Sequence, residues 1–235
     1  MSLRNSILPK TTTLQNRWYN GGIGVIRASI GHPLVHLLKD DPFCQSDHLS
    51  QRVQSVSNTL STAGKFRPCL VVTKRKVRRI FLMGTLEGKS PLAIDKLTQE
   101  FLMPIAPTFR KGAFQLTVNP TGLATPSWIV GVPSTLGFDN LLGYWTNDGP
   151  GNLTYRVAPQ DVDEFLAHCT QKKYDFLQLS ESNPEYKTDL VNQFLDCLEE
   201  LYGNAPHHRN DDGSKSSTGS GRIPKLQSIV DFPPL

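Results

Sequence analysis

The stretch that determines the fold reads GKFRPCLVVTKRKVRRIFLMGT and spans residues 64–85. It holds two dense apolar runs, residues 69–73 and 80–85, joined by a short charged link. Apolar runs of this length on either side of a polar turn are typical of the two strands of a β-hairpin. The sequence therefore predicts a hairpin near the middle of the chain.

The positive charge of the chain is concentrated in this hairpin. Residues 65–79 hold seven Lys and Arg residues and no acidic residue, whereas the rest of the chain holds 18 basic and 21 acidic residues. A concentrated basic segment is expected in a protein that binds phosphate backbones. Two alternatives stay open: charges that protect exposed strand edges, and a nuclear-import patch at residues 74–79. The candidate nucleic-acid-binding residues are Lys65, Lys74, Arg75, Lys76, Arg78 and Arg79.

Residues 1–63, upstream of the hairpin, are interpreted as an N-terminal extension. Within it, Leu49, Val53, Val56 and Leu60 recur at spacings of four, three and four residues. This spacing places all four side chains on one face of a helix. We therefore expect a short amphipathic helix in the extension.

Residues 64–203 are expected to form a β-rich core domain that ends in two helices. Further short apolar runs, separated by Gly and Pro, occupy residues 102–105, 115–118, 128–132 and 153–157. Pro104 predicts an edge strand or a strand end. Residues 159–202 carry apolar side chains at helical spacing in two blocks, and Asn183-Pro184 marks the start of the second. The predicted fold class is α+β: a small, strongly bent antiparallel sheet or SH3-like half-open barrel with two C-terminal helices.

Residues 204–235 have a different composition from the preceding helices. Their first part is polar and rich in Gly and Ser, so it cannot bury enough apolar surface to offset the entropy of ordering. We therefore expect a disordered tail. The last seven residues, 229–235, are apolar again and would either rest on their own domain or bind a protein partner.

The composition also excludes several classes of protein. No apolar run approaches the roughly 18–20 residues of a membrane span, so no membrane association is expected. The start of the chain lacks an apolar signal segment, which predicts a cytoplasmic or nuclear protein. Four widely spaced cysteines are interpreted as reduced thiols. The pair His32 and His36 has no carboxylate cluster beside it, so neither a metal site nor another cofactor is expected.

One motif resembles a known family. Gly64-Lys65-Phe66-Arg67-Pro68, followed by the apolar run, resembles the Gly-x-x-Arg-Pro signature of the MazF/PemK toxin-like endoribonucleases. The resemblance covers at most residues 60–140. It implies a small SH3-like barrel that cleaves single-stranded RNA without a metal. It also implies active-site roles for Arg67 and for Thr85, which ends the next strand.

The chemistry of RNA cleavage explains these residue types. The RNA 2′-hydroxyl attacks the adjacent phosphorus, and negative charge builds on the phosphoryl oxygens. Arg67 would stabilise that charge with its planar, always-ionised donor fork, and the Thr85 hydroxyl would add a second donor. No carboxylate occurs in residues 60–66. Glu87 is the nearest candidate general base, because it follows Thr85 by two residues on the same side of a strand.

Three functions stay open at this point. The first is a MazF/PemK-like, metal-independent endoribonuclease centred on Arg67 and Thr85. The second is a binding module that uses the basic hairpin to hold RNA or DNA without cleaving it. The third is a protein-interaction or structural domain whose basic hairpin contacts an acidic partner. The candidate partners are single-stranded RNA, a second copy of the chain in a homodimer, and a protein that binds the C-terminal tail.

Overall fold

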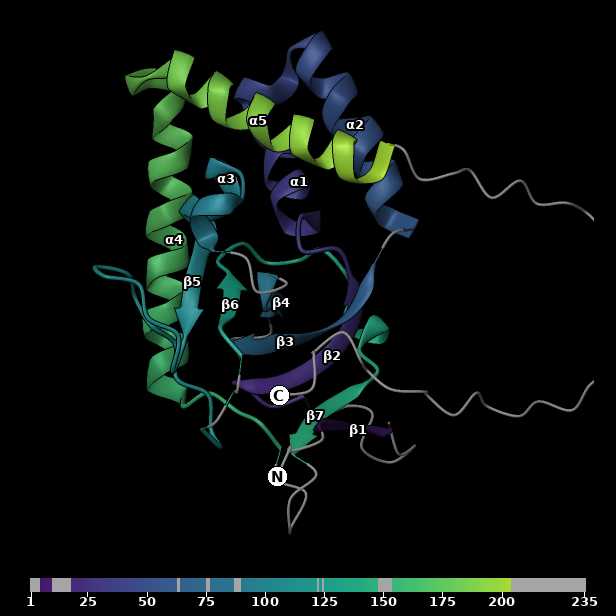
Figure 1. Ribbon diagram of the computed structural model, residues 1–235, viewed down its shortest axis with the longest axis vertical. Helices are drawn as coiled ribbons and strands as arrows, with labels where there is room; N and C mark the ends of the chain where they lie inside the picture. Colours follow the sequence, from purple (N-terminus) through teal and green to yellow (C-terminus); the bar gives the residue numbers. More distant parts are fainter. Residues whose placement is uncertain are drawn as a thin grey trace, which may run out of the picture.

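The predicted hairpin forms strands β3 (Lys65–Lys74) and β4 (Val77–Gly84), which pair antiparallel in the register Cys69↔Leu82. The computed structural model describes residues 5–9, 18–62, 64–74, 77–86, 90–121, 123, 125–147 and 154–203. It is an α+β protein with an open antiparallel sheet and several helices (Figure 1). The predicted tail, residues 204–235, lies outside the described residues.

The hairpin occupies the middle of a seven-stranded sheet with the order β1-β7-β2-β3-β4-β6-β5. The other strands are β1 (Asn5–Pro9), β2 (Gly22–Ala28), β5 (Leu102–Ile105), β6 (Ser127–Val130) and β7 (Gly143–Asn147). Neighbouring strands pair antiparallel throughout. Pro104 lies in the edge strand β5, as predicted, where the missing N–H of proline is tolerated.

The predicted helices are present. The α-helices are α1 (His32–Lys39), α2 (Asp47–Thr62), α3 (Lys96–Phe101), α4 (Pro159–Ser182) and α5 (Pro184–Gly203). Helix α2 is the expected amphipathic helix, and α4 and α5 are the expected C-terminal pair. Asn183 caps α5, because its side-chain oxygen accepts a hydrogen bond of 3.1 Å from the Tyr186 N–H.

Two parts of the chain have structures that the sequence pattern did not indicate. Strand β2, within residues 1–63, pairs with β3 along its whole length. The expected boundary between the N-terminal extension and the core domain, at residue 63, therefore falls between β2 and β3, which are neighbours in one sheet. Residues 115–118 and 153–157 were expected as strands; residues 115–118 and 154–157 form only isolated bridges, including Ile105↔Leu116 and Thr146↔Thr154, and residue 153 lies outside the described residues.

Both faces of β3 and β4 are covered. On one face, Leu70, Val72 and Phe81 pack against α4, where the rings of Phe81 and Phe165 meet edge-on at 4.9 Å. On the other face, Cys69, Val71, Ile80 and Leu82 pack against residues 134–141, including Leu141. Two-sided burial explains why these strands read as continuous apolar runs rather than as alternating patterns.

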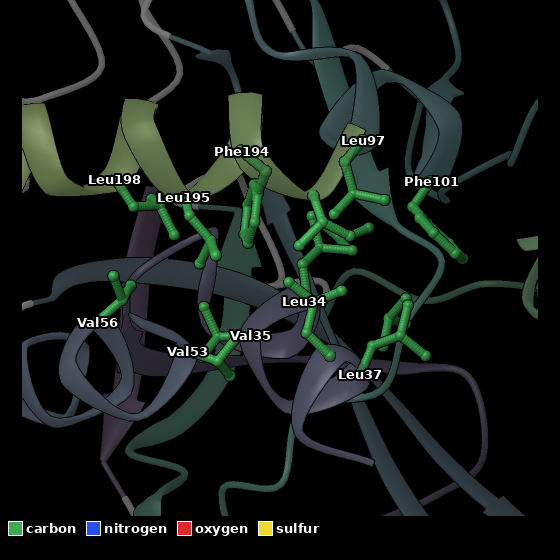
Figure 2. Packing of buried hydrophobic residues seen from close by; sticks show 14 of the residues in the cluster. Leu34, Val35, Leu37, Val53, Val56, Leu97, Phe101, Phe194, Leu195 and Leu198 are labelled. Carbon is green, nitrogen blue, oxygen red and sulfur yellow. The ribbon is translucent and has the colours of Figure 1, made fainter. Parts of the chain in front are cut away.

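A third apolar cluster joins the helices at one end of the sheet. Figure 1 shows α5 running across α1 and α2, and Figure 2 shows Phe194, Leu195 and Leu198 of α5 pointing toward the side chains of those two helices. A fully buried ion pair adds to this junction, because Lys187 Nζ lies 2.6 Å from Asp41 Oδ2. Among the described residues, no helix is both long and apolar enough to cross a membrane.

Two glycines with positive φ provide a matched test of the fold. Gly21 has φ +84°, and an added Cβ would lie 2.3 Å from the Val157 carbonyl oxygen, whereas a Cβ on Gly112 (φ +75°) would meet nothing within 4 Å. Gly112→Ala should therefore cost only the backbone strain, about 1–2 kcal/mol. Gly21→Ala should cost more than about 3 kcal/mol of unfolding free energy, because the clash is with backbone. Urea unfolding of both variants measures the difference, and equal losses would contradict this account.

Candidate functional site

Arg67 lies at the end of β3 where the chain enters the sheet. It is half-buried, and its Nε–H donates a hydrogen bond of 3.1 Å to the Ala28 carbonyl of β2. A Cβ added to Gly84 would lie 3.0 Å from Arg67 Nη1. The guanidinium therefore lies over the last residue of β4, where glycine leaves space for it. The contact with Ala28 orients the plane of the guanidinium.

Thr85 directly follows this glycine and is half-buried. Thr85 therefore lies at the same end of the hairpin as Arg67, one residue beyond the glycine under the guanidinium.

The backbone is strained immediately after Thr85. Leu86 has φ +54°, a left-handed conformation that costs a branched residue about 1–2 kcal/mol. Its side chain packs against the apolar cluster of the helices, which holds this turn in place. Strained residues that the surrounding structure enforces are often found at functional sites. Glu87, the candidate general base, lies outside the described residues.

The basic residues of the hairpin divide between its two ends. Lys65 is exposed at the Arg67 end, whereas Lys74, Arg78 and Arg79 are exposed at the opposite end. Lys74 comes seven positions after Arg67 in β3, and at about 3.3 Å per residue the two are roughly 23 Å apart along the strand. Arg75 and Lys76 lie outside the described residues. The structure thus places Arg67 and Thr85 at the same end of the hairpin and most of the described basic residues at the other end.

Within the basic end, adjacent arginines face opposite sides of the sheet. The Arg78 guanidinium lies 5.5 Å from the centre of the Phe138 ring, on the face covered by residues 134–141. Arg79 is on the α4 face, where Lys74 Nζ also forms an ion pair of 2.7 Å with Asp163 Oδ1. Both members of this pair are about half exposed, so the pair contributes little to stability.

The pair His32 and His36 showed no metal-site pattern in the sequence, and nothing in the sequence indicated that His32 is buried against Ser134. His32 is buried, and its Nδ1 lies 3.4 Å from the Ser134 hydroxyl, which also accepts a hydrogen bond from the Leu136 N–H. The pKa of His32 is lowered to about 4, mainly by burial and in smaller part by the nearby His36 and Lys39. His32 is therefore neutral at pH 7 and helps to hold residues 134–141 against the sheet.

The site offers no metal-ligand cluster within the described part of the chain, where no three His, Cys, Asp or Glu residues gather. The buried cysteines also lack the properties of a nucleophile. Burial raises the pKa of Cys44 to about 12, and it raises the pKa values of Cys69 and Cys169 as well. These thiols stay protonated at neutral pH and act as core side chains.

Comparisons of the chain with protein-family models, with curated proteins and with solved structures returned no match. The features that bear on function are the position of Arg67 over Gly84, beside Thr85 in the chain, and the charges at the other end of the hairpin.

The buried His32 makes stability depend on pH. Its folded pKa of about 4 lies below its ordinary value of 6.5, so between these values the unfolded chain binds a proton that the folded chain does not. The free energy of unfolding should therefore fall, by up to about 3 kcal/mol from this group, as the pH drops from 6.5 to 4. His32→Gln should flatten that decline, whereas His48→Gln, at an exposed position of α2, should leave it unchanged. Chemical denaturation across this pH range measures both, and parallel curves for the wild type and His32→Gln would contradict the assignment.

Proposed function

We propose that the protein is a MazF/PemK-like endoribonuclease that cleaves single-stranded RNA without a metal ion. The observation that carries the proposal is the Arg67 guanidinium, which is oriented by the Ala28 carbonyl and lies over Gly84 next to Thr85. Arginine suits this task because its donor fork matches the geometry of phosphoryl oxygens and stays charged at every physiological pH.

The proposed reaction needs three groups. The RNA 2′-oxygen forms a bond to the adjacent phosphorus, the bond to the 5′-oxygen breaks, the departing oxygen takes up a proton from water, and a cyclic phosphate remains on the other product. Arg67 and the Thr85 hydroxyl stabilise the negative charge on the phosphoryl oxygens during this step. A general base takes the proton of the 2′-hydroxyl, and Glu87 stays the candidate because it follows Thr85 by two residues.

The scaffold proposed for this chemistry is an SH3-like, half-open barrel formed around β2, β3 and β4. The support for it is the strong curvature of β2 and β3 in Figure 1 and the short connection between β3 and β4. Such a bent sheet exposes the ends of its central strands, and Arg67 and Thr85 lie at one of these ends.

A second candidate function is a nucleic-acid-binding module that does not cleave. The observation that favours it is the separation of roughly 23 Å along β3 between Arg67 and the basic end of the hairpin. Lys74, Arg78 and Arg79 are exposed there and would hold phosphates without sequence preference. In this case binding weakens steeply with salt and the RNA stays intact.

Cleavage of single-stranded RNA in EDTA tests the first candidate. The wild type should cleave, and Arg67→Ala should reduce the rate by about 100- to 1,000-fold, the usual effect of removing a donor to developing negative charge. Thr85→Ala should reduce the rate by at least about tenfold. Arg27→Ala is the matched control, because Arg27 is exposed on β2 and its Nε–H donates to the Gly64 carbonyl at 3.0 Å.

The outcomes separate the two functions when each variant is first shown to be folded. Cleavage that persists in Arg67→Ala would contradict the proposed active site. Intact RNA in every reaction, together with salt-sensitive binding, would select the non-catalytic binding module instead.

A further inference from the structure

A cavity of about 320 Å³ lies between the basic end of the hairpin and helix α4. It is open to the surface and is lined by Val72, Lys74, Val77, Arg79 and Leu166. Three of the lining side chains are aliphatic and two are cationic. This cavity is separate from Arg67, because Lys74 and Arg67 lie near opposite ends of β3.

The register of the hairpin places four of these side chains on one face. Val72 pairs with Arg79, and Lys74 pairs with Val77. The two pairs are two residues apart along each strand, and side chains at that spacing point to the same face of a sheet. Helix α4 packs on this same face and contributes Leu166. The cavity is thus fixed by strand pairing and by the packing of α4.

Charged groups of both signs lie beside the cavity, with the cations Lys74 and Arg79 in its lining and the carboxylates Asp161, Asp163 and Glu164 in the first turns of α4. Besides Lys74 and Arg79, Lys172 lies on the next turns of α4, where its Nζ donates to the Glu100 carbonyl at 2.5 Å. Arg79 and Lys172 both lie close enough to the Cys169 thiol to oppose the rise in its pKa, although burial has the larger effect. The carboxylate that pairs with a lining cation is Asp163, 2.7 Å from Lys74 Nζ.

The lining determines the chemistry of the ligand. Ligand cavities start at about 300 Å³, so this cavity suits one small planar group. Its aliphatic walls offer a base an apolar surface, and its charged groups suit phosphates. Among the lining residues there is no uncharged polar side chain that would read the edge of a base. An arginine guanidinium also stacks on the face of a base.

We propose that this cavity holds one base of single-stranded RNA, with the flanking phosphates on Lys74 and Arg79. The inference rests on the proposed function for its choice of RNA, and it adds an anchor several nucleotides from the cleavage centre. Binding here is sequence-tolerant, because it uses the base face and the backbone rather than base edges.

Adjacent arginines allow a matched test with the full-length chain. The probe is a fluorescent single-stranded 2′-O-methyl RNA of mixed sequence, which cannot be cleaved by attack of a 2′-hydroxyl. Arg79→Gln should raise the Kd by about tenfold, whereas Arg78→Gln, which removes the same charge from the opposite face, should raise it by less than about threefold. Asp163→Asn should lower the Kd by about twofold to threefold, because it removes the anion that competes for Lys74.

Equal losses in Arg79→Gln and Arg78→Gln would show that only diffuse charge binds RNA, and would overturn the proposal. Weaker binding in Asp163→Asn, or preferential binding of an acidic peptide over the RNA, would also overturn it. Arg79-specific binding by a protein that cannot cleave RNA would contradict the proposed nuclease and leave the cavity assignment supported. Arg67-dependent cleavage without Arg79-specific binding would support the proposed nuclease and overturn the cavity assignment.

Discussion

Strand β3 lies between β2 and β4, and the middle of this strand is buried on both faces. Cys69, Leu70, Val71 and Val72 are all at most 2% exposed, and burying an aliphatic side chain of this size contributes about 1.5–3 kcal/mol. The packing of α4 on one face and of residues 134–141 on the other both depend on this strand. Only the two ends of β3 reach the surface, so polar function is confined to those ends.

This constraint explains the division of the candidate site. At one end, Arg67 is held by the Ala28 carbonyl and lies over Gly84, where phosphoryl chemistry is proposed. At the other end, Lys74 and Arg79 line a cavity under α4. A single hairpin thus carries a proposed cleavage centre and a proposed anchor, and its length sets the spacing between them.

The sequence predicted the parts of the fold whose apolar residues follow one clear period. Strands β3 and β4 and helices α2, α4 and α5 belong to this group. Strand β2 was not predicted, because Gly22 and Gly24 stand at positions where a strand normally carries side chains. The rings of Tyr19, Tyr144 and Trp18 fill that space, and an added Cβ would approach them to 3.0–3.1 Å. The Tyr144 ring comes from the distant strand β7, whereas Trp18 and Tyr19 lie shortly before β2, so the packing that replaces the missing side chains is only partly local.

Part of the candidate site was also accessible from the sequence. The antiparallel register of a short hairpin brings Arg67 near the end of the next strand, and strand alternation separates Arg78 from Arg79. The contact between His32 and Ser134 was not predictable, because 102 residues separate them in the chain. The cavity likewise depends on where α4 packs, which the period of a helix does not specify.

The most direct test of the central claim is the cleavage rate of Gly84→Ala in EDTA, measured alongside its unfolding free energy. An added Cβ would lie 3.0 Å from Arg67 Nη1 and 3.5 Å from Ile30 Cδ1, which are both ends of side chains, so the fold should tolerate it within about 1 kcal/mol. The displaced guanidinium should lower the rate by about 10- to 100-fold. A folded Gly84→Ala variant that cleaves RNA as fast as the wild type would contradict the claim that Arg67 acts from this position.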